Sequence, residues 1–552
     1  KNIRRAKALQ RRKVMKKTNL KKIIATVLAC VTAFSLFSGC RIEVNKGKKD
    51  RRERTPRSEY QQDYNYDFYS RDKLTIKIIA PINESKYSKT DNLIPEIEKA
   101  TNTKLDVTFV SEDAFADRLV TSLSSNDTPE LFCRVPNRQA IIRDGAAYPL
   151  YDLLMQYAPN YMDTMESYND PDMLLELTDV ASFEIYSMMN IREPECQLSF
   201  MIRKDWLDAL KLDVPETWDE FVAVLQAFKD GDPNGNGDSN DEIPFSVQDI
   251  TNLRYAFGID TRYYFAMDGN EYVPTVYHSQ YKNYLESLQE LFAAGLLDNT
   301  YNERGYAGLQ NIMGNNTLGC TIYYSEFAKL GTEDLRKNGF TSGTWMGIQP
   351  IKGPNGESGV QSAGGFENNF MISSKVSAEK AREIVRFMNW FYTKDGINLL
   401  NYGVDGKHNT VNQDGTRTIK PEYANFTAAR KEGMLFESFN YRFSVDAYLQ
   451  YVFNGNTVNN LAETDKLFYD ALGLGDENGK GKYKFVKNCF CLYTDEWTKK
   501  STTLESDMNK FEENAIKGIY YGNKLNSELD NLKNKYKTAY DEAKAAYAEL
   551  KK

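Results

Sequence analysis

Strands and helices alternate along the first part of the globular chain, and this alternation restricts the possible fold more than any other feature. Apolar strands are predicted over residues 73–80, 105–110 and 130–134. Amphipathic helices are predicted between them, around residues 93–97 and over 114–123. Strands that alternate with helices form a parallel sheet covered by helices on both faces. The sequence therefore predicts an α/β fold.

Polar residues follow the first and third predicted strands, at the edge where such a sheet binds its ligands. In open α/β sheets, ligands bind beyond the carboxyl ends of the strands. The residues in that position are Asn83, Glu84 and Tyr87 after the first strand, and Arg134, Asn137 and Arg138 after the third. Each of them also fits an ordinary solvated loop residue.

A second patterned stretch runs over residues 197–245. A short apolar strand at 198–202 leads into a helix that stops near Leu210. A second helix has Thr217 as its N-cap candidate and ends at Gly231. Its apolar face consists of Trp218, Phe221, Leu225 and Phe228. These two tryptophan-bearing helices, which start at Arg203 and at Thr217, are expected to place Trp206 and Trp218 in a core.

The loop after this second helix is the clearest chemical signal in the chain. Asp232, Asn234 and Asn236 occupy alternate positions, and Gly237 follows them. This is the first half of an EF-hand calcium loop, with oxygen ligands at positions one, three and five and glycine at six. Calcium takes six to eight oxygen ligands, and alternate side chains of a tight turn can converge on one ion.

The pattern departs from an EF-hand at position twelve, where the bidentate glutamate is replaced by Ile243. Asp241 and Glu242 stand just before it, where they would close the site from a shorter loop. The alternative interpretation is a solvated turn of Asn and Gly residues without an ion.

Several motifs in this stretch occur together in one known family. They are I-R-K-D-W-L at 202–207, P-E-T-W-D-E-F at 215–221, A-F-K-D-G-D-P-N-G-N-G at 227–237 and D-E-I-P-F at 241–245. In this order they resemble the large solute-binding lipoproteins of carbohydrate ABC importers from Gram-positive bacteria. Further similar segments lie at 145–160, 345–356, 377–396 and 402–408, so the resemblance covers roughly residues 73–418.

The resemblance implies a calcium site and a two-lobe fold. The implied ligands of a structural Ca²⁺ are Asp232, Asn234, Asn236, the carbonyl of Asp238, Asp241 and Glu242. The loop is one residue longer than the family's usual form. The implied fold is the type II periplasmic-binding-protein-like, Venus-flytrap architecture, with strands crossing between its lobes as a hinge.

We expect one lobe over residues 73–189 and 352–400, and the other over residues 190–351 and 401–552. The second lobe is expected to end in an amphipathic helix, whose apolar residues run from Leu525 to Tyr547. The crossings near 185–198, 352 and 400 would be the hinge. The expected ligand-binding residues, several of them aromatic, are Arg134, Tyr323, Tyr324, Trp345, Phe366 and Tyr402.

Residues 1–39 have the features of a leader and signal peptide. Met15 is the expected initiator, and a basic segment precedes an apolar run over 23–37. Ser38 and Gly39 come directly before Cys40, which resembles a lipoprotein processing site with Cys40 as the lipidated residue. The alternative is ordinary secretory cleavage. Residues 40–72 hold almost no aliphatic side chains, so a disordered tether is predicted there.

The chain is more acidic without its leader. The first 39 residues hold 11 of the 70 Lys and Arg and none of the 77 acids, which leaves a net charge of about −18. Such a balance argues against nucleic acid as a partner. Five cysteines remain besides Cys30 and Cys40, without a C-x-x-C motif, so we interpret them as small buried residues. The pair Cys489 and Cys491 is the expected exception.

The chain lacks the common catalytic signatures but is rich in aromatic residues. It contains two histidines and no nucleophile elbow, zinc-protease, Walker or dinucleotide motif. It has 36 Tyr, 29 Phe and 5 Trp, and flat rings beside polar groups suit the apolar faces and hydroxyl rims of sugars. The aromatic candidates, expected on loops, are Tyr263, Tyr264, Tyr323, Tyr324, Trp345, Phe366 and Tyr402.

Together these features predict a monomeric, lipid-anchored receptor on the extracellular face of the cell membrane. It would capture an oligosaccharide and deliver it to the transmembrane subunits of an ABC permease, without catalysis. The alternative function is that of a surface lipoprotein that acts as a polysaccharide hydrolase or lyase, because paired carboxylates alone leave no sequence signature.

Overall fold

The computed structural model describes residues 54–65, 67–82, 93–125, 128–168, 173–192, 198–238, 240–259, 265–361, 365–434, 444–456, 460–474, 485–486 and 494–551. Several predicted features lie outside them: the leader, Cys40, the candidates at 83–87, Tyr263 and Tyr264, Cys196, and the pair Cys489 and Cys491. Within the described ranges, no helix is both long enough and apolar enough to span a bilayer.

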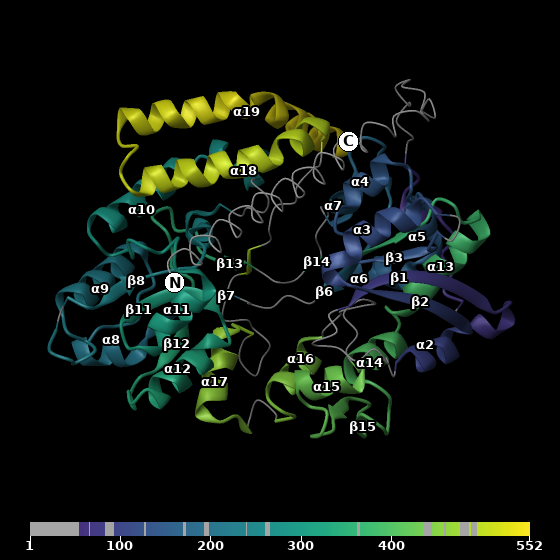
Figure 1. Ribbon diagram of the computed structural model, residues 1–552, viewed down its shortest axis with the longest axis horizontal. Helices are drawn as coiled ribbons and strands as arrows, with labels where there is room; N and C mark the ends of the chain where they lie inside the picture. Colours follow the sequence, from purple (N-terminus) through teal and green to yellow (C-terminus); the bar gives the residue numbers. More distant parts are fainter. Residues whose placement is uncertain are drawn as a thin grey trace, which may run out of the picture. The chain divides into compact units, whose positions relative to one another are not determined.

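The first sheet has five strands and is built from three distant parts of the chain (Figure 1). Its order is β2 (Thr103–Ser111), β1 (Leu74–Ile82), β3 (Leu131–Cys133), β14 (Gly365–Ile372) and β6 (Met188–Arg192). The first three strands are parallel, as predicted from the strand–helix alternation. Strand β14 is antiparallel to both β3 and β6, so the sheet is mixed.

Both faces of this sheet are buried, because successive side chains enter different cores. Ile78, Cys133 and Phe370 belong to one apolar cluster, and Ile79, Phe132 and Met371 to the other. The covering helices are α2 (Ile94–Thr101), α3 (Glu112–Leu123), α4 (Arg138–Arg143), α5 (Tyr151–Tyr157), α6 (Pro159–Glu166), α7 (Met173–Leu177), α13 (Ala378–Trp390) and α14 (Lys394–Tyr402). A short hairpin of β4 (Thr178–Asp179) and β5 (Glu184–Ile185) follows α7.

The second sheet has four strands and its own core. Its order is β12 (Trp345–Ile348), β7 (Leu198–Arg203), β11 (Leu318–Tyr324) and β8 (Ile243–Phe245). Strand β7 is antiparallel to β11 and β12, and β8 is parallel to β11. The helical elements around it are α8 (Lys204–Leu210), α9 (Trp218–Asp230), η3 (Ile250–Phe257), η4 (Thr275–Tyr277), α10 (Tyr281–Ala293), α11 (Gly305–Gly314), α12 (Phe327–Lys337) and α17 (Glu463–Ala471). The predicted core positions of Trp206 and Trp218 are confirmed, since both are buried there.

Two long C-terminal helices, α18 (Asp495–Ile516) and α19 (Asn523–Leu550), lie side by side and complete this second core (Figure 1). The apolar face of α19 is buried in the same cluster as β7 and α9. A buried ion pair ties α18 to η3: Glu512 pairs with Arg254 and also accepts a hydrogen bond of 2.6 Å from the hydroxyl of Tyr281. A hairpin, β9 (Phe265–Asp268) and β10 (Glu271–Pro274), packs against α19.

Residues 402–456 form a smaller unit with a separate apolar cluster. It contains β15 (Asn409–Val411), β16 (Arg417–Ile419), α15 (Phe426–Glu432) and α16 (Val445–Val452). The sequence analysis assigned this stretch to the second lobe, but its core residues are not part of the second-sheet cores. The boundary expected at residue 189 falls inside β6, which pairs with β14 of the first sheet. A parallel pair, β13 (Val360–Gln361) and β17 (Phe485–Val486), completes the strands described.

The predicted disordered tether is wrong for residues 55–72, which we call the N-terminal strap. Its described residues pack on the helices of the first sheet and include two short 3₁₀ turns, η1 (Arg57–Glu59) and η2 (Phe68–Ser70). Arg57 forms ion pairs of 2.5 Å with Asp163 and 2.7 Å with Glu166, both on α6. Phe68 is 8% exposed and joins the apolar core.

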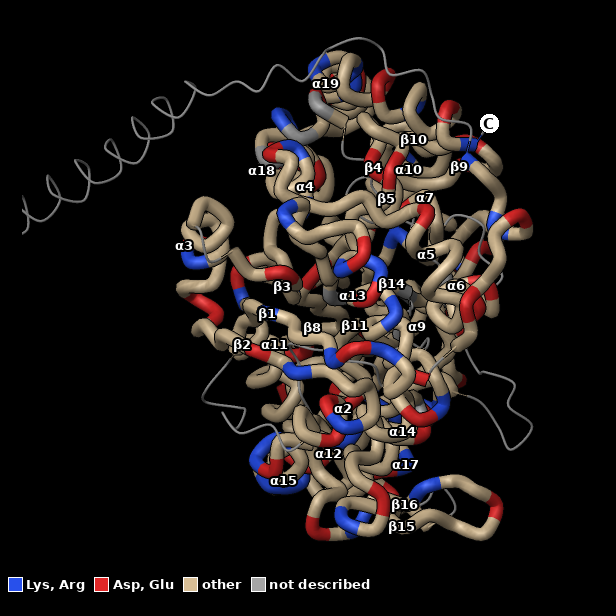
Figure 2. The backbone as a smooth tube through the Cα atoms, turned by 90° about the vertical axis from the view of Figure 1, so that its right-hand side faces the viewer, with Lys and Arg blue, Asp and Glu red and all other residues tan. Residues whose placement is uncertain are grey.

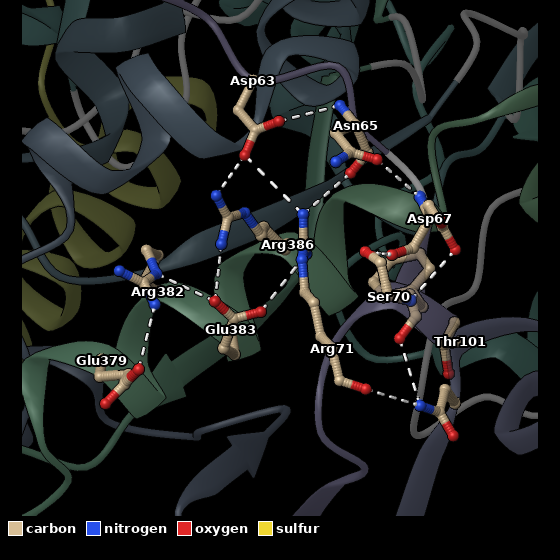
Figure 3. A network of polar contacts seen from close by, with 12 residues as sticks. Asp63, Asn65, Asp67, Ser70, Arg71, Thr101, Glu379, Arg382, Glu383 and Arg386 are labelled. Atoms are coloured by element: carbon tan, nitrogen blue, oxygen red, sulfur yellow. Dashed lines mark hydrogen bonds and ion pairs between the residues drawn. The ribbon is translucent and has the colours of Figure 1, made fainter.

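A second group of charges holds the middle of the strap on α13, as Figure 3 shows. Arg386 pairs with Asp63 of the strap and, at 2.6 Å, with Glu383 of its own helix. Arg71 also reaches Glu383, at 3.3 Å. Charged groups and tyrosine hydroxyls, rather than aliphatic side chains, make most of the strap's contacts. Composition alone therefore predicts disorder, because it shows the lack of aliphatic residues but not the polar partners.

Candidate calcium and ligand sites

The Asp232–Glu242 loop connects α9 to β8 in the second lobe. Helix α9 begins with a capping box, in which Thr217 and Glu220 exchange hydrogen bonds with each other's backbone. The loop turns at Gly235 and Gly237, whose φ angles of 71° and 87° suit glycine.

The polar side chains of this loop converge as predicted from their alternation. The Asp232 carboxylate accepts hydrogen bonds from the backbone N–H of Asn236 at 3.1 Å and of Gly237 at 2.8 Å. The amide groups of Asn234 and Asn236 donate to Asp241 at 3.0 and 2.7 Å. These contacts bring four of the six predicted ligands together around one point of the turn.

Glu242 is the exception in this hydrogen-bonded loop. It is 9% exposed, and neither of its carboxylate oxygens has a hydrogen-bond partner in the described chain. Burial raises the pKa of Glu242 to about 7, and the nearby carboxylates of Asp241, Asp232 and Asp238 add to the rise. A buried carboxylate without a partner is unfavourable unless a proton or a cation compensates it.

The donor set fits a hard cation such as Ca²⁺. It offers carboxylates from Asp232, Asp241 and Glu242 together with amide oxygens of two asparagines, and none of its acids forms an ion pair with Lys or Arg in the described residues. The described chain contains no group of three His, Cys, Asp or Glu side chains already arranged around a metal position. In the present geometry the asparagine N–H groups contact Asp241, so ion binding requires their amide oxygens to turn inward.

Four of the aromatic residues predicted on loops lie on strands instead: Tyr323 and Tyr324 in β11, Trp345 in β12 and Phe366 in β14. Trp345 begins β12, is fully buried, and donates its indole N–H to the Met313 carbonyl at 3.2 Å. It packs in the core between the second sheet and α11 and α12, so this prediction placed a core residue at the ligand site. Phe366 lies in β14 and is 3% exposed, in the core of the first sheet.

Two of the predicted tyrosines are also mostly covered by protein. Tyr402 ends α14, is 9% exposed, and donates its hydroxyl to Asp446 at 2.8 Å. Tyr323 lies near the end of β11 and is 1% exposed; its hydroxyl accepts a hydrogen bond of 3.0 Å from Gln310. Both rings are fixed by neighbours and leave little surface for a ligand in this conformation.

Tyr324 and Arg134 retain exposed side-chain surface at the carboxyl ends of their strands. Tyr324 is the last residue of β11 and is partly exposed. Arg134 directly follows β3, has a φ of 54°, and forms an ion pair of 3.2 Å with Glu112. The Arg134 backbone N–H donates to the Asn369 carbonyl at 2.7 Å, which fixes this turn against β14.

Tyr306, which the sequence analysis did not select, lies beside Tyr324. It is 49% exposed on α11, and its ring centroid is 6.0 Å from that of Tyr324, with the two planes inclined by 24°. Residues 306 and 324 lie on different elements, and only the packing of α11 beside β11 brings them together. No spacing in the sequence indicates this pair.

The cysteines in the described chain are buried, as predicted. Cys133 in β3 and Cys320 in β11 are both free thiols with no exposed surface. Burial raises the pKa of both thiols well above the usual value. They act as small apolar residues in the two sheets.

Comparison with known families gives a match to the model of bacterial extracellular solute-binding proteins over residues 81–397. This range covers more than half of the chain and includes every strand of the two sheets except most of β1. The chain belongs to this family.

Two characterised relatives are named for saccharides. The polygalacturonan/rhamnogalacturonan-binding protein YtcQ of Bacillus subtilis is 27% identical over 344 residues, which are 60% of this chain and 66% of YtcQ. The fructooligosaccharide ABC transporter substrate-binding protein FusA of Streptococcus pneumoniae is 32% identical over 232 residues, which are 37% of this chain and 41% of FusA. The match therefore spans slightly less than two thirds of YtcQ and less than half of FusA.

Solved structures establish the fold. A solute-binding protein of Bifidobacterium longum infantis, described as HMO-binding and associated with an ABC transporter, aligns with a TM-score of 0.62 at 18% identity, covering 87% of this chain and 98% of its own. The alginate-binding protein AlgQ2 aligns with a TM-score of 0.59 at 18% identity, covering 87% of this chain and 97% of its own. The fold is α/β with the two-domain, periplasmic-binding-protein-like architecture.

Proposed function

We propose that this chain is the substrate-binding lipoprotein of an ABC importer. It captures an oligosaccharide outside the cell and delivers it to the transmembrane subunits of a permease, and it catalyses no reaction. The observation that carries this proposal is the family match over residues 81–397, which joins both sheets into one solute-binding unit. The saccharide names of YtcQ and FusA support an oligosaccharide as the solute.

Isothermal titration calorimetry and thermal melting of the purified chain test this function. A panel of oligosaccharides should contain at least one ligand that binds and raises the melting temperature, since a ligand at ~100 times its dissociation constant adds ~2.7 kcal/mol. The same incubations, analysed for shortened or unsaturated products, test the alternative of a polysaccharide hydrolase or lyase. Turnover of any saccharide, or the absence of binding across the panel, contradicts the proposal.

The ligand would bind between the two lobes and favour their closure. Arg134, paired with Glu112, offers hydrogen-bond donors from the first lobe and Tyr324 a ring from the second, and each follows or ends a strand at its carboxyl end. A ligand that touches both lobes stabilises the closed state by its differential affinity. X-ray scattering with and without a saturating saccharide should show a smaller radius of gyration in the complex, and an unchanged radius rejects closure.

The Asp232–Glu242 loop binds a structural Ca²⁺ in this proposal. The support is the converging oxygen set and the two carboxylate oxygens of Glu242 that lack a partner within the described chain. The crystallised EF-hand mutant of FusA indicates that this relative also contains an EF-hand. Bound calcium would hold the loop together and take no part in contacts with the solute.

The chain is anchored through lipid on Cys40, according to the same proposal. The support is the basic segment, the apolar run over 23–37 and the small residues before Cys40. Stable anchoring requires two lipid signals, because one acyl chain binds a bilayer only marginally. The variant Cys40→Ala should therefore leave the membrane fraction, and its normal processing and retention there would refute this assignment.

A further inference from the structure

An aromatic cluster at the carboxyl end of β11 combines a rigid base with exposed rings. We define it by the residues Tyr306, Tyr323, Tyr324 and Phe327. Tyr323 forms the buried base, with its ring 4.8 Å from Phe327 and 5.3 Å from Tyr324 between centroids. Tyr306 and Tyr324 are nearly parallel and present ring surface to solvent, with Tyr306 49% exposed.

The two exposed rings are held together by their hydroxyl groups. A hydrogen bond between the hydroxyl groups of Tyr306 and Tyr324 raises the pKa of Tyr324 to about 12, so the Tyr324 ring remains neutral at physiological pH. The hydroxyl of Tyr323 is occupied by Gln310. A pair of neutral, oriented rings of this kind offers an apolar face with a hydroxyl rim, which matches the C–H face and hydroxyls of a sugar unit.

The charges around this cluster are unfavourable for an acidic ligand. Glu326 follows Tyr324 by two residues, and its carboxylate has no ion-pair or hydrogen-bond partner in the described chain. The residue keeps exposed surface, while partial burial of its carboxyl group raises the pKa of Glu326 above the ordinary value. Glu326 directly precedes Phe327, whose ring packs on Tyr323 at 4.8 Å between centroids, so its backbone lies beside the cluster. A negative charge on Glu326 contributes to the raised pKa of Tyr323 and Tyr324. A carboxylate in this position repels a uronate and accepts hydrogen bonds from sugar hydroxyls.

Every cation in the surrounding stretch is already paired. Residues 301–340 contain four Lys and Arg, and each forms an ion pair: Arg304 with Asp298, Lys329 with Asp465, Arg336 with Glu463 and Lys337 with Asp334. Along the whole described chain, basic and acidic residues are likewise interspersed (Figure 2). Recognition of a carboxylated sugar favours an available Arg or Lys, and residues 301–340 hold no unpaired one.

We propose that the aromatic cluster binds a neutral sugar unit and discriminates against uronic acids. The inference deepens the proposed function and depends on it. It separates two chemistries that the relatives leave open, since YtcQ is named for polygalacturonan and FusA for fructooligosaccharides. The geometry favours the uncharged class for this chain.

A matched pair of ligands tests the inference by titration calorimetry on the full chain. Trigalacturonate and its fully methyl-esterified form share one backbone and differ in charge, and neutral fructo-, malto- and galacto-oligosaccharides complete the panel. We expect the best neutral ligand to bind at least about tenfold more tightly than trigalacturonate, a difference of ~1.4 kcal/mol. If uronates bind equally or more tightly, the inference is wrong while the proposed function stands. If no saccharide binds, the proposed function itself fails.

Two variants locate the effect at the cluster. Glu326→Gln should narrow the preference for neutral over charged ligands about fivefold, because it removes one repulsive contact of ~1 kcal/mol at the surface. Tyr306→Ala should lower the affinity for the best neutral ligand about tenfold, because it removes an exposed stacking ring.

The control is Glu422→Gln, which alters an exposed carboxylate in the smaller unit of 402–456. It should change neither the affinity for the neutral ligand nor the preference for neutral over charged ligands. Unchanged melting temperatures would show that the folds are intact, and unchanged affinities in both cluster variants would overturn the assignment.

Discussion

The N-terminal strap and the Asp232–Glu242 loop have similar compositions but opposite electrostatic arrangements. Both are rich in charged and amide side chains and poor in aliphatic ones. In the strap, Arg57 meets Asp163 and Glu166, and Asp63 meets Arg386, so charges of the chain neutralise each other. In the loop, carboxylates lie near one another without a described Lys or Arg partner, and Glu242 is buried among them.

This difference shows that charge content alone does not decide whether a polar segment is ordered. The strap is ordered by partners that are already present on α6 and α13. In the proposed function the loop takes its partner, a cation, from outside the chain, because the neighbouring carboxylates of Asp232, Asp238 and Asp241 disfavour a further negative charge on Glu242. Stability should therefore depend on the chain's own side chains in the strap and on the solution's cations in the loop.

The largest effect should come from removing Phe68, the buried aromatic anchor among the described residues of the strap. Phe68→Ala should lower the free energy of unfolding by ~3 kcal/mol, because a phenylalanine truncation in a core typically costs 3–5 kcal/mol and this ring retains slight exposure. Urea denaturation measures the change. The control Tyr69→Phe alters a ring that is 65% exposed and should stay within ~0.5 kcal/mol. A small loss for Phe68→Ala would mean that the strap contributes little to the fold.

Calcium removal should have the next largest effect and should act on the loop alone. Addition of Ca²⁺ at ~100 times its dissociation constant should stabilise the chelator-treated protein by ~2.7 kcal/mol, measured by calorimetric melting. Mg²⁺ at the same concentration should stabilise it less, since it requires stricter octahedral geometry and retains its waters. Identical melting curves in chelator and in calcium would contradict the cation requirement.

Removal of the α13 cation that holds the strap should have a moderate effect. Arg386→Met should cost ~1–2 kcal/mol, because the partly buried carboxylates of Asp63 and Glu383 lose their nearer shared cation and then share only Arg71, at the longer distances of 3.9 and 3.3 Å. The control Lys99→Met removes an ion pair whose lysine side chain is 78% exposed and should change stability by less than ~0.5 kcal/mol. If both variants lower the free energy of unfolding by the same amount, the partly buried network contributes no more to stability than an exposed ion pair, and the prediction is wrong.

Neutralising the buried Glu242 of the loop should stabilise the calcium-free protein, whereas most substitutions lower the free energy of unfolding. In chelator at pH 8, Glu242→Gln should stabilise the protein by ~1 kcal/mol, because it removes a buried carboxylate that lacks a partner in the described chain. The same variant should lose most of the stabilisation by calcium, because it removes a charged ligand. Calorimetric melting with and without calcium measures both effects. Destabilisation in chelator would show that this carboxylate already has a compensating partner.

The smallest effect should be a local loosening of the strap from α13 at low pH. Partial burial opposes ionisation of Asp63, but the hydrogen bond from the Asn65 backbone and the Arg386 charge together lower its pKa below the ordinary value of 3.8. A lowered folded pKa means that this group stabilises the fold above the unfolded pKa and that its contribution is lost as pH falls through the folded pKa. Hydrogen exchange at the strap should therefore rise below about pH 4. Asp63→Asn should abolish this pH dependence, and its persistence would assign the release to other carboxylates.

The sequence predicted the fold class, the first three strands of the first sheet and the convergence of polar side chains in the Asp232–Glu242 loop, because each depends on local periodicity or local spacing; calcium binding there stays a prediction. The alternation over 73–134 and the D-x-N-x-N-G pattern both act within about 60 residues. The strap could not be predicted, because Arg57 finds its partners 106 and 109 residues away. The tyrosine pair of positions 306 and 324 was missed for the same reason, and Trp345 was misplaced because its strand was interpreted as a loop.

The position of β14 in the first sheet governs the order in which the chain can complete its fold. Residues 365–372 fill the place between β3 and β6, which were made some 230 and 170 residues earlier, respectively. Until that segment emerges during synthesis, the inner edges of both strands expose unpaired backbone groups, and such edges recruit other chains. All four strands of the second sheet are made by residue 348, although its core also needs α18 and α19. Of the two sheets, the one whose strands begin earlier is therefore the later to have all its strands, and we expect the first sheet to be the segment for which nascent molecules need protection from aggregation.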